Sequence, residues 1–188
     1  MKGGVRIAAI TTGPIGKGSG RKSGSRALLV CVVGTLNGVE GVLSTNVTID
    51  GDDATRKITV MIKKSRFGEQ VKAIAFNGIA LAGLNIVDIS ELDRSLSAKS
   101  MIITRHKPRP SLLMNALRAL KRETNMVIGG RAELLRSQKK SAHINGFYVQ
   151  SGMDRWDTAR ILMTAASLLR LSHLISSGVS RGESKGRM

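Results

Sequence analysis

The chain has 188 residues, 41% of them hydrophobic, and its 30 Lys and Arg against 13 Asp and Glu give a formal net charge of +17. This length and hydrophobic content are typical of one globular domain with its own core. The apolar runs fall well short of the about 20 residues that a membrane-spanning helix needs, and the basic start lacks the apolar stretch of a signal peptide. We therefore expect a single cytoplasmic domain without a membrane partner, in which Cys31 is a small core residue of a reducing compartment.

The positive charge is concentrated in three parts of the chain. Residues 1–27 carry six Lys and Arg and no acid, residues 105–140 carry ten with two acids, and residues 170–188 carry four with one acid. Charge that served solubility alone would be spread more evenly. Its segregation indicates a polyanionic partner, and a nucleic-acid backbone is the usual one. An acidic protein partner is the alternative.

The aromatic residues are few, only five in the whole chain. Proteins that bind single strands stack bases on aromatic rings, so this composition favours backbone contact with structured RNA or duplex DNA. We expect the following basic residues to make that contact: Lys17, Arg21, Lys22, Arg26, Arg105, Lys107, Arg109, Arg118, Lys121, Arg122, Lys139, Lys140, Arg181, Lys185 and Arg187.

The first half of the chain alternates apolar strand patterns with one helical pattern. Apolar runs bounded by glycine or turn residues predict strands, and these cover residues 6–11, 27–36, 41–50 and 71–78. Between the last two, Asp53 is a candidate N-cap of a helix whose buried face carries Ile58, Met61 and Ile62. The strand at 71–78 follows a helical crossover, so we expect it to lie parallel to a neighbouring strand.

The second half contains more helix. We expect a short helix around residues 87–92, a strand at 100–110 that ends in a basic loop, and a helix from 111 with Ser111 as its cap. Residues 128–143 are basic and poorly periodic, which indicates a connector, and a last strand follows at 143–152. Asp154 then caps one or two helices. The whole chain, 1–188, is predicted as one mixed α/β sheet with flanking helices, a basic loop at 13–27 and a basic tail at 179–188.

Several common sites do not match the sequence. In the stretch GPIGKGSG, Gly13 and Gly16 enclose two residues where a P-loop needs four before its Gly-Lys-Ser/Thr, and a strand follows the loop instead of a helix. The three histidines and the one cysteine lack zinc-ligand spacing. His173, in an apolar helix, is predicted to be a core histidine. Asp50, Asp52 and Asp53 form a cluster that suits caps and turns, with a divalent cation as the alternative.

Three stretches carry a family resemblance: EGVLSTNVTIDGDDAT (40–55), SRFGEQVKAIAFNGIALAGLNIVDI (65–89) and HLISSGVSRGES (173–184). Together with IAAITTGPI near the N-terminus, they resemble the archaeal deoxyuridine endonucleases, relatives of endonuclease V with an RNase H-like fold. The resemblance implies a metal-dependent phosphodiesterase that acts on DNA with deaminated bases. In such enzymes acidic side chains at the ends of adjacent strands hold Mg²⁺, which activates water.

The sequence departs from that family pattern where the chemistry lies. The resemblance implies an aspartate pair before Gly-Pro, at the positions of Thr11 and Thr12, and an aspartate before glycine at the position of Asn77. These neutral residues do not supply the anionic oxygens that Mg²⁺ prefers. Residual candidates for catalysis are Asp50, Asp52, Asp53 and Glu183.

Two functional hypotheses follow. The first is a catalytically silent protein without a metal cofactor, which binds structured nucleic acid on an endonuclease-like scaffold, for example as a ribosome or ribonucleoprotein component. The second is an active Mg²⁺-dependent endonuclease on deoxyuridine-containing DNA, which uses acids in other positions.

Overall fold

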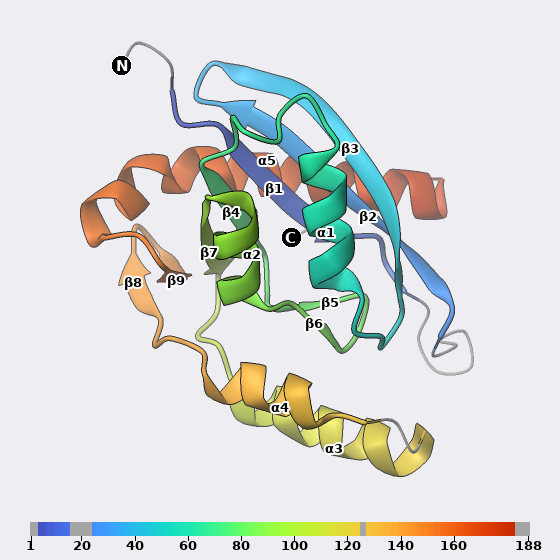
Figure 1. Ribbon diagram of the computed structural model, residues 1–188. Coiled ribbons are helices and arrows are strands. Elements are labelled where there is room, and N and C mark those ends of the chain that lie inside the picture. Colours follow the sequence, from blue (N-terminus) through green and yellow to red (C-terminus); the bar gives the residue numbers. More distant parts are fainter. Residues whose placement is uncertain (1–3, 16–23, 125–126, 183–188) are drawn as a thin grey trace.

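The computed structural model describes residues 4–15, 24–124 and 127–182 and shows a twisted sheet with helices on both faces (Figure 1). Within these ranges the strands are β1 (Ile7–Thr12), β2 (Arg26–Thr35), β3 (Gly38–Thr48), β4 (Ala73–Phe76), β5 (Ala80–Leu81), β6 (Asn85–Ile86), β7 (Lys99–Thr104), β8 (Ala142–Ile144) and β9 (Phe147–Ser151). The helices are α1 (Ala54–Lys63), α2 (Ile89–Leu96), α3 (Pro110–Thr124), α4 (Gly129–Arg136) and α5 (Arg155–Arg181).

The main sheet has seven strands in the order β3-β2-β1-β4-β7-β9-β8, and β5 and β6 form a separate two-stranded ribbon. The first three strands form an antiparallel meander, while β4 is parallel to both β1 and β7. The final hairpin, β8–β9, pairs antiparallel with β7. This arrangement confirms the mixed sheet and the parallel orientation that the sequence predicts for the strand at 71–78.

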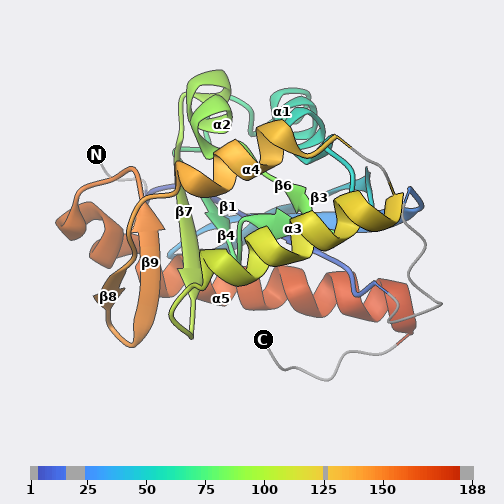
Figure 2. The same ribbon diagram turned by 90° about the horizontal axis from the view of Figure 1, so that it is seen from below.

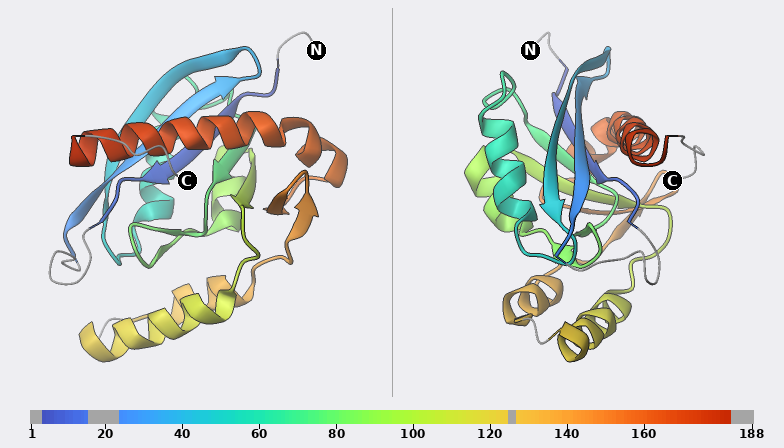
Figure 3. Two further views of the ribbon diagram at one scale, coloured as in Figure 1. Left: turned by 180° about the vertical axis from the view of Figure 1, so that it is seen from behind. Right: turned by 90° about the vertical axis from the view of Figure 1, so that its right-hand side faces the viewer.

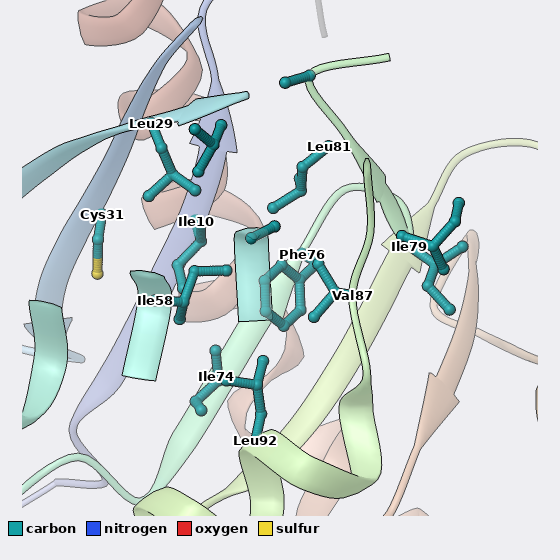
Figure 4. Packing of buried hydrophobic residues seen from close by; sticks show 14 of the residues in the cluster. Ile10, Leu29, Cys31, Ile58, Ile74, Phe76, Ile79, Leu81, Val87 and Leu92 are labelled. Carbon is teal, nitrogen blue, oxygen red and sulfur yellow. The ribbon is translucent and has the colours of Figure 1, made fainter. Parts of the chain in front are cut away.

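One face of the sheet is covered by α1 and α2. Ile10 and Phe76 project from the sheet toward this layer and are both 0% exposed, and Ile58 of α1 and Leu92 of α2 pack around them (Figure 4). Each such side chain contributes about 1.5–3 kcal/mol to stability through its burial. Cys31 lies in the same core, where burial raises the pKa of its thiol to about 12.

The opposite face is covered by the long helix α5, which crosses the sheet diagonally (Figure 3). Its apolar side chains, among them Leu162, Ala165 and Leu169, pack against the alternate residues of β1, including Ile7 and Ala9. Because neighbouring residues of a strand point to opposite faces, β1 contributes to both layers of the core.

The helices α3 and α4 form a hairpin outside these layers, beyond the end of the sheet (Figures 1 and 2). The hairpin starts after β7 and therefore lies at the carboxyl ends of the parallel strands. Leu117 and Leu120 of α3 and Leu135 of α4 join the core that contains Ile10 and Phe76, and so do Leu81 and Leu84 of the β5–β6 region. The hairpin is thus attached to the body through apolar contacts at its inner face.

The structure corrects several sequence-based expectations. Residues 129–136 form the helix α4 within the predicted connector, and the predicted last strand is a hairpin that turns at Asn145 and Gly146, both with positive φ. A single helix, α5, follows Asp154, whose side chain accepts a hydrogen bond from the N–H of Asp157 and so confirms the predicted cap. That helix continues to Arg181, into the predicted tail.

Of the caps predicted for two other helices, Asp53 is confirmed in position only and Ser111 is wrong. The side chain of Asp53 does not cap α1, although the residue stands at the N-cap position. Helix α3 begins at Pro110, one residue before the expected cap Ser111. Proline is common in the first turn of a helix, because the N–H group that it lacks would have no hydrogen-bond partner there. The predicted basic loop at 13–27 also changes at its end, because Arg26 and Ala27 belong to β2. No helix in the described ranges is long and apolar enough to cross a membrane.

Candidate functional site

The structure brings together the strand ends at which the family resemblance places acids. Parallel pairing aligns Ile10 of β1 with Phe76 of β4, so that Thr11, Thr12 and Asn77 follow at the same edge of the sheet. In mixed α/β sheets, binding sites often lie outside the carboxyl ends of parallel strands. This edge is therefore the candidate site, and its chemistry depends on what these three side chains do.

Thr11 faces α5 and is 0% exposed. Its hydroxyl oxygen lies 2.9 Å from the hydroxyl of Ser172 and 3.4 Å from that of Ser176. Since the Ser172 hydroxyl donates to the carbonyl of Val30 at 2.9 Å, Thr11 is the donor in its bond to Ser172. The hydroxyl of Thr11 therefore helps to hold α5 against the sheet.

Thr12 and Asn77 point to different surroundings. The hydroxyl of Thr12 accepts a hydrogen bond from the N–H of Ala82, on the face opposite to α5. Asn77 is exposed and lines a cavity of about 330 Å³ together with residues of β7, β9 and α5, among them Phe147, and with Arg105 of the connector after β7. Two adjacent threonines on opposite faces do not direct two oxygens at one ion.

The turn after β1 is closely covered by the end of α5. A Cβ at Gly13 would lie 2.3 Å from the hydroxyl oxygen of Ser180 and 3.1 Å from the carbonyl of Ser176. The N–H of Gly13 donates to the carbonyl of Leu28 at 2.8 Å. A side chain here would have to displace the Ser180 hydroxyl, so glycine favours the close approach of the helix to the strand end.

Asp53 has a structural role. Its carboxylate accepts hydrogen bonds from the N–H and hydroxyl of Thr48 and from the amide of Asn85, and it forms an ion pair with Lys57 at 2.7 Å. Burial opposes ionisation, but these bonds together hold the pKa of Asp53 well below its usual range. The contacts of Asp53 are therefore those of a structural residue, as expected for the acidic cluster if it serves caps and turns.

Asp50 lies closer to the strand ends. It is 2% exposed, has a φ of 59°, and its carboxylate accepts a hydrogen bond from the N–H of Leu84 at 2.9 Å. Its backbone N–H donates to the carbonyl of Ala82, the residue whose N–H contacts Thr12. Asp52, in contrast, is exposed, and Glu183 lies outside the described residues.

The described residues do not fit the magnesium site that the fold family implies. Mg²⁺ needs near-octahedral oxygen ligands and is bound through one or more carboxylates. Thr11 and Thr12 offer neutral oxygens engaged in internal hydrogen bonds, and no group of three or more His, Cys, Asp or Glu gathers anywhere in the described ranges. We derive no metal-assisted step for this site.

The predicted basic residues that the structure describes are exposed and lie around the same end of the molecule. They are Arg26, Arg105, Lys107, Arg109, Arg118, Lys121, Arg122, Lys139, Lys140 and Arg181. Arg26 starts β2 beside the β1 turn, Arg181 ends α5, and the others belong to the α3–α4 hairpin and its connectors. Lys17, Arg21, Lys22, Lys185 and Arg187 lie outside the described residues.

Sequence reasoning missed the role of Arg131. This residue of α4 is only 7% exposed, and its guanidinium donates to the carbonyls of Asp50, Gly51 and Leu84 at 2.6–3.3 Å. It thereby ties α4 to the turn that carries Asp50. Local sequence gives no signal for this contact, because its acceptors are backbone atoms more than forty residues away.

His173 also differs from the expected core histidine. It is half-buried, and its ring nitrogen lies 3.4 Å from the hydroxyl of Ser177, one turn further along α5. Its position on the helix that covers Thr11 places it near the candidate site without an acidic partner among the contacts that the structure describes.

The chain is similar in sequence to archaeal UPF0215 proteins. The chain is 34% identical over 167 residues to a UPF0215 protein of Archaeoglobus fulgidus, which covers 84% of this chain and 90% of that protein. It is 30% identical over 191 residues to a UPF0215 protein of Methanopyrus kandleri, and this match covers 96% of this chain and 93% of that protein.

Solved structures give the same picture. A protein of unknown function from Archaeoglobus fulgidus superposes with a TM-score of 0.79 at 27% identity, over 93% of this chain and 98% of that one. Human endonuclease V superposes with a TM-score of 0.52 at 10% identity, over 90% and 84%. Ciona intestinalis endonuclease V, in complex with a 24mer DNA that contains inosine, gives 0.50 at 10%, over 86% and 77%. These likenesses show the endonuclease V, RNase H-like fold.

The endonuclease dU family profile matches residues 3–180, almost the whole chain. The resemblance found in the sequence motifs is therefore confirmed, and the chain belongs to the endonuclease dU family.

Proposed function

We propose that this protein binds base-paired nucleic acid through its basic surface and does not cleave it by the metal-assisted route of endonucleases. The observation that carries the proposal is the state of Thr11. It stands where the family resemblance implies an acid, and its hydroxyl is buried in hydrogen bonds to α5. A side chain that joins a helix to a strand supports packing, and it offers no charge to a cation.

The charge distribution supports the binding half of the proposal. The exposed cations belong mostly to the α3–α4 hairpin and its connectors, beyond the carboxyl ends of the parallel strands (Figure 1), and such a concentration of positive charge attracts a polyanion. Nucleic-acid backbones bind to such surfaces with release of counterions. The fold neighbour from Ciona intestinalis was solved with DNA, which supports nucleic acid as the ligand class. A ribosomal or ribonucleoprotein RNA is one ligand of this class.

The test combines binding and salt dependence. Fluorescence anisotropy with a labelled duplex should give an affinity that falls steeply between about 50 and 200 mM salt, because each neutralised phosphate adds about 0.9 to the slope. Binding without salt dependence would contradict the proposal. Sequencing of nucleic acid that copurifies from native extract would show whether the ligand is RNA or DNA.

One observation favours the endonuclease alternative. Asp50 is a buried carboxylate that shares a backbone neighbour, Ala82, with Thr12. A cleavage assay with Mg²⁺ or Mn²⁺ on deoxyuridine-containing duplex tests this alternative. Cleavage that is lost in both Asp50→Asn and Asp52→Asn variants, each folded by circular dichroism, would establish it. Asp53 is unsuitable for that purpose, because its loss removes the bonds that hold the start of α1.

A further inference from the structure

Residues of the connector from β7 and of the connector to β8 line a basic groove at the base of the α3–α4 hairpin. Its charged side chains are Lys107 from the first connector, Arg136 at the end of α4, and Lys139 and Lys140 from the second connector. Among the residues that the structure describes, no Asp or Glu lines it. These cations come from segments about thirty residues apart, so the sequence alone does not place them together.

The walls of the groove are held by hydrogen bonds from the sheet. The side-chain amide of Gln150 in β9 donates to the carbonyl of Lys139 at 2.7 Å, and the hydroxyl of Thr104 in β7 donates to the carbonyl of His106 at 2.8 Å. These bonds fix both connectors next to their basic residues. A ligand therefore meets cations whose backbone is already positioned, which lowers the entropic cost of binding.

The chemistry of the lining indicates the type of ligand. The apolar part consists of Leu135, two prolines and a methionine, and the described lining residues include no aromatic ring on which a base could stack. The N-terminus of α3 begins at Pro110 in the same lining and adds its positive dipole end to the four cations. Such a surface suits phosphate groups presented by a regular double-stranded backbone.

We infer that this groove holds consecutive backbone phosphates of base-paired nucleic acid and is the principal contact outside the strand ends. The inference rests on the proposed function and names the surface that performs it. Arg136, which sequence reasoning left out of the binding residues, is part of this surface, whereas the buried Arg131 on the same helix is not.

A second cavity near basic residues provides the comparison. It is lined by Lys63, Arg66 and Lys72, but also by Glu69, and it lies at the opposite end of α1 from the strand ends. Lys63 and the adjacent Lys64 are both exposed. Replacing this pair removes the same charge as replacing Lys139 and Lys140, so the two double variants differ only in where the charge was.

The experiment measures anisotropy of a labelled DNA duplex, an RNA duplex and a single strand with wild type, Lys139→Ala/Lys140→Ala and Lys63→Ala/Lys64→Ala. For the groove variant we expect a salt slope lower by about 2 on duplexes, since each lost phosphate contact removes about 0.9. The Lys63/Lys64 variant should retain the wild-type slope. Addition of Arg136→Ala to the groove variant should lower the slope again.

The outcomes separate the two claims. Equal loss in both double variants, or an unchanged slope in the groove variant while the wild type binds, would overturn the groove and leave the proposed function standing. A groove effect on the single strand as large as that on the duplexes would also overturn it, because the ligand would not need base pairing. Failure of the wild type to bind any of the three probes would overturn the proposed function itself. Thermal melting of each variant checks that these exposed substitutions leave the fold intact.

Discussion

The hydroxyl of Thr11 at the end of β1 lies 2.9 Å from the hydroxyl of Ser172 in α5, and both are buried. This bond joins the strand end to the helix that covers one face of the sheet. The family resemblance implies an aspartate, and thus a negative charge, at the same strand end. Here the strand end contributes to the attachment of a helix instead.

Replacing Thr11 with Val keeps the shape of the side chain and removes its hydroxyl. We expect the free energy of unfolding to fall by about 1 kcal/mol, because a buried hydrogen bond is lost while Ser172 keeps its bond to Val30. Chemical denaturation measures the change, and Ser167→Ala on the exposed face of α5 is the control. Unchanged stability together with weaker duplex binding would contradict the packing role.

A side chain at Gly13 should disturb the end of α5. The added methyl group of Gly13→Ala would lie within 2.3 Å of the Ser180 hydroxyl, and such overpacking costs about 1–3 kcal/mol. Ser180→Ala removes that oxygen, so the double variant should recover part of the loss. A thermodynamic cycle of the four proteins measures the coupling between the two sites. Additive effects would show that the two residues do not touch in solution.

Asp53 should make stability depend on acid. Its pKa is depressed in the folded state, so its contribution is fully present above the pKa of unfolded aspartate, about 3.9, and is lost as the pH falls toward the folded value. At neutral pH the free energy of unfolding of Asp53→Asn should be about 2 kcal/mol lower than that of the wild type, since the variant loses charged hydrogen bonds. Its stability should also fall less on acidification below about pH 5 than that of the wild type. Parallel pH profiles of the two proteins would contradict this account.

Arg131 and Arg136 lie on the same helix, but replacing them should change the stability of the protein by very different amounts. Arg131→Met leaves the carbonyls of Asp50 and Gly51 without their donor, and we expect a loss of about 2–4 kcal/mol. Arg136→Met alters an exposed residue and should change stability by less than about 0.5 kcal/mol. Thermal denaturation of both variants is the measurement. A similar small effect in both would mean that the buried contact contributes little.

The sequence predicts the sheet well because its strands are local apolar runs. The buried segments of β1, β2 and β4 and the helix around Ile58 and Ile62 have periodicities that propensity and burial both favour. The Asn145–Gly146 dipeptide is a hairpin signal that the interpretation as one strand overlooked.

The remaining misses depend on contacts distant in sequence. Helix α4 begins with two glycines and is held by Arg131, whose acceptors lie in the turn after β3 and beside β6. The side chain of Asp53 accepts a hydrogen bond from Asn85 instead of capping α1, and this partner lies too far along the chain for a local pattern to contain it. The sequence predicts where the candidate site lies, since Thr11, Thr12 and Asn77 are found at one edge of the sheet. The hydrogen bonds of Thr11 to α5 and of Thr12 with Ala82 could be found only in the structure.

The most direct test of the central claim follows one labelled duplex through binding and chemistry. A duplex that contains deoxyuridine is incubated with excess protein and Mn²⁺, the complex is isolated, and the recovered strands are run on a denaturing gel. We predict that the duplex is bound and that both strands are recovered intact. Strands cut in the wild-type complex, and uncut with Asp50→Asn, would contradict the account.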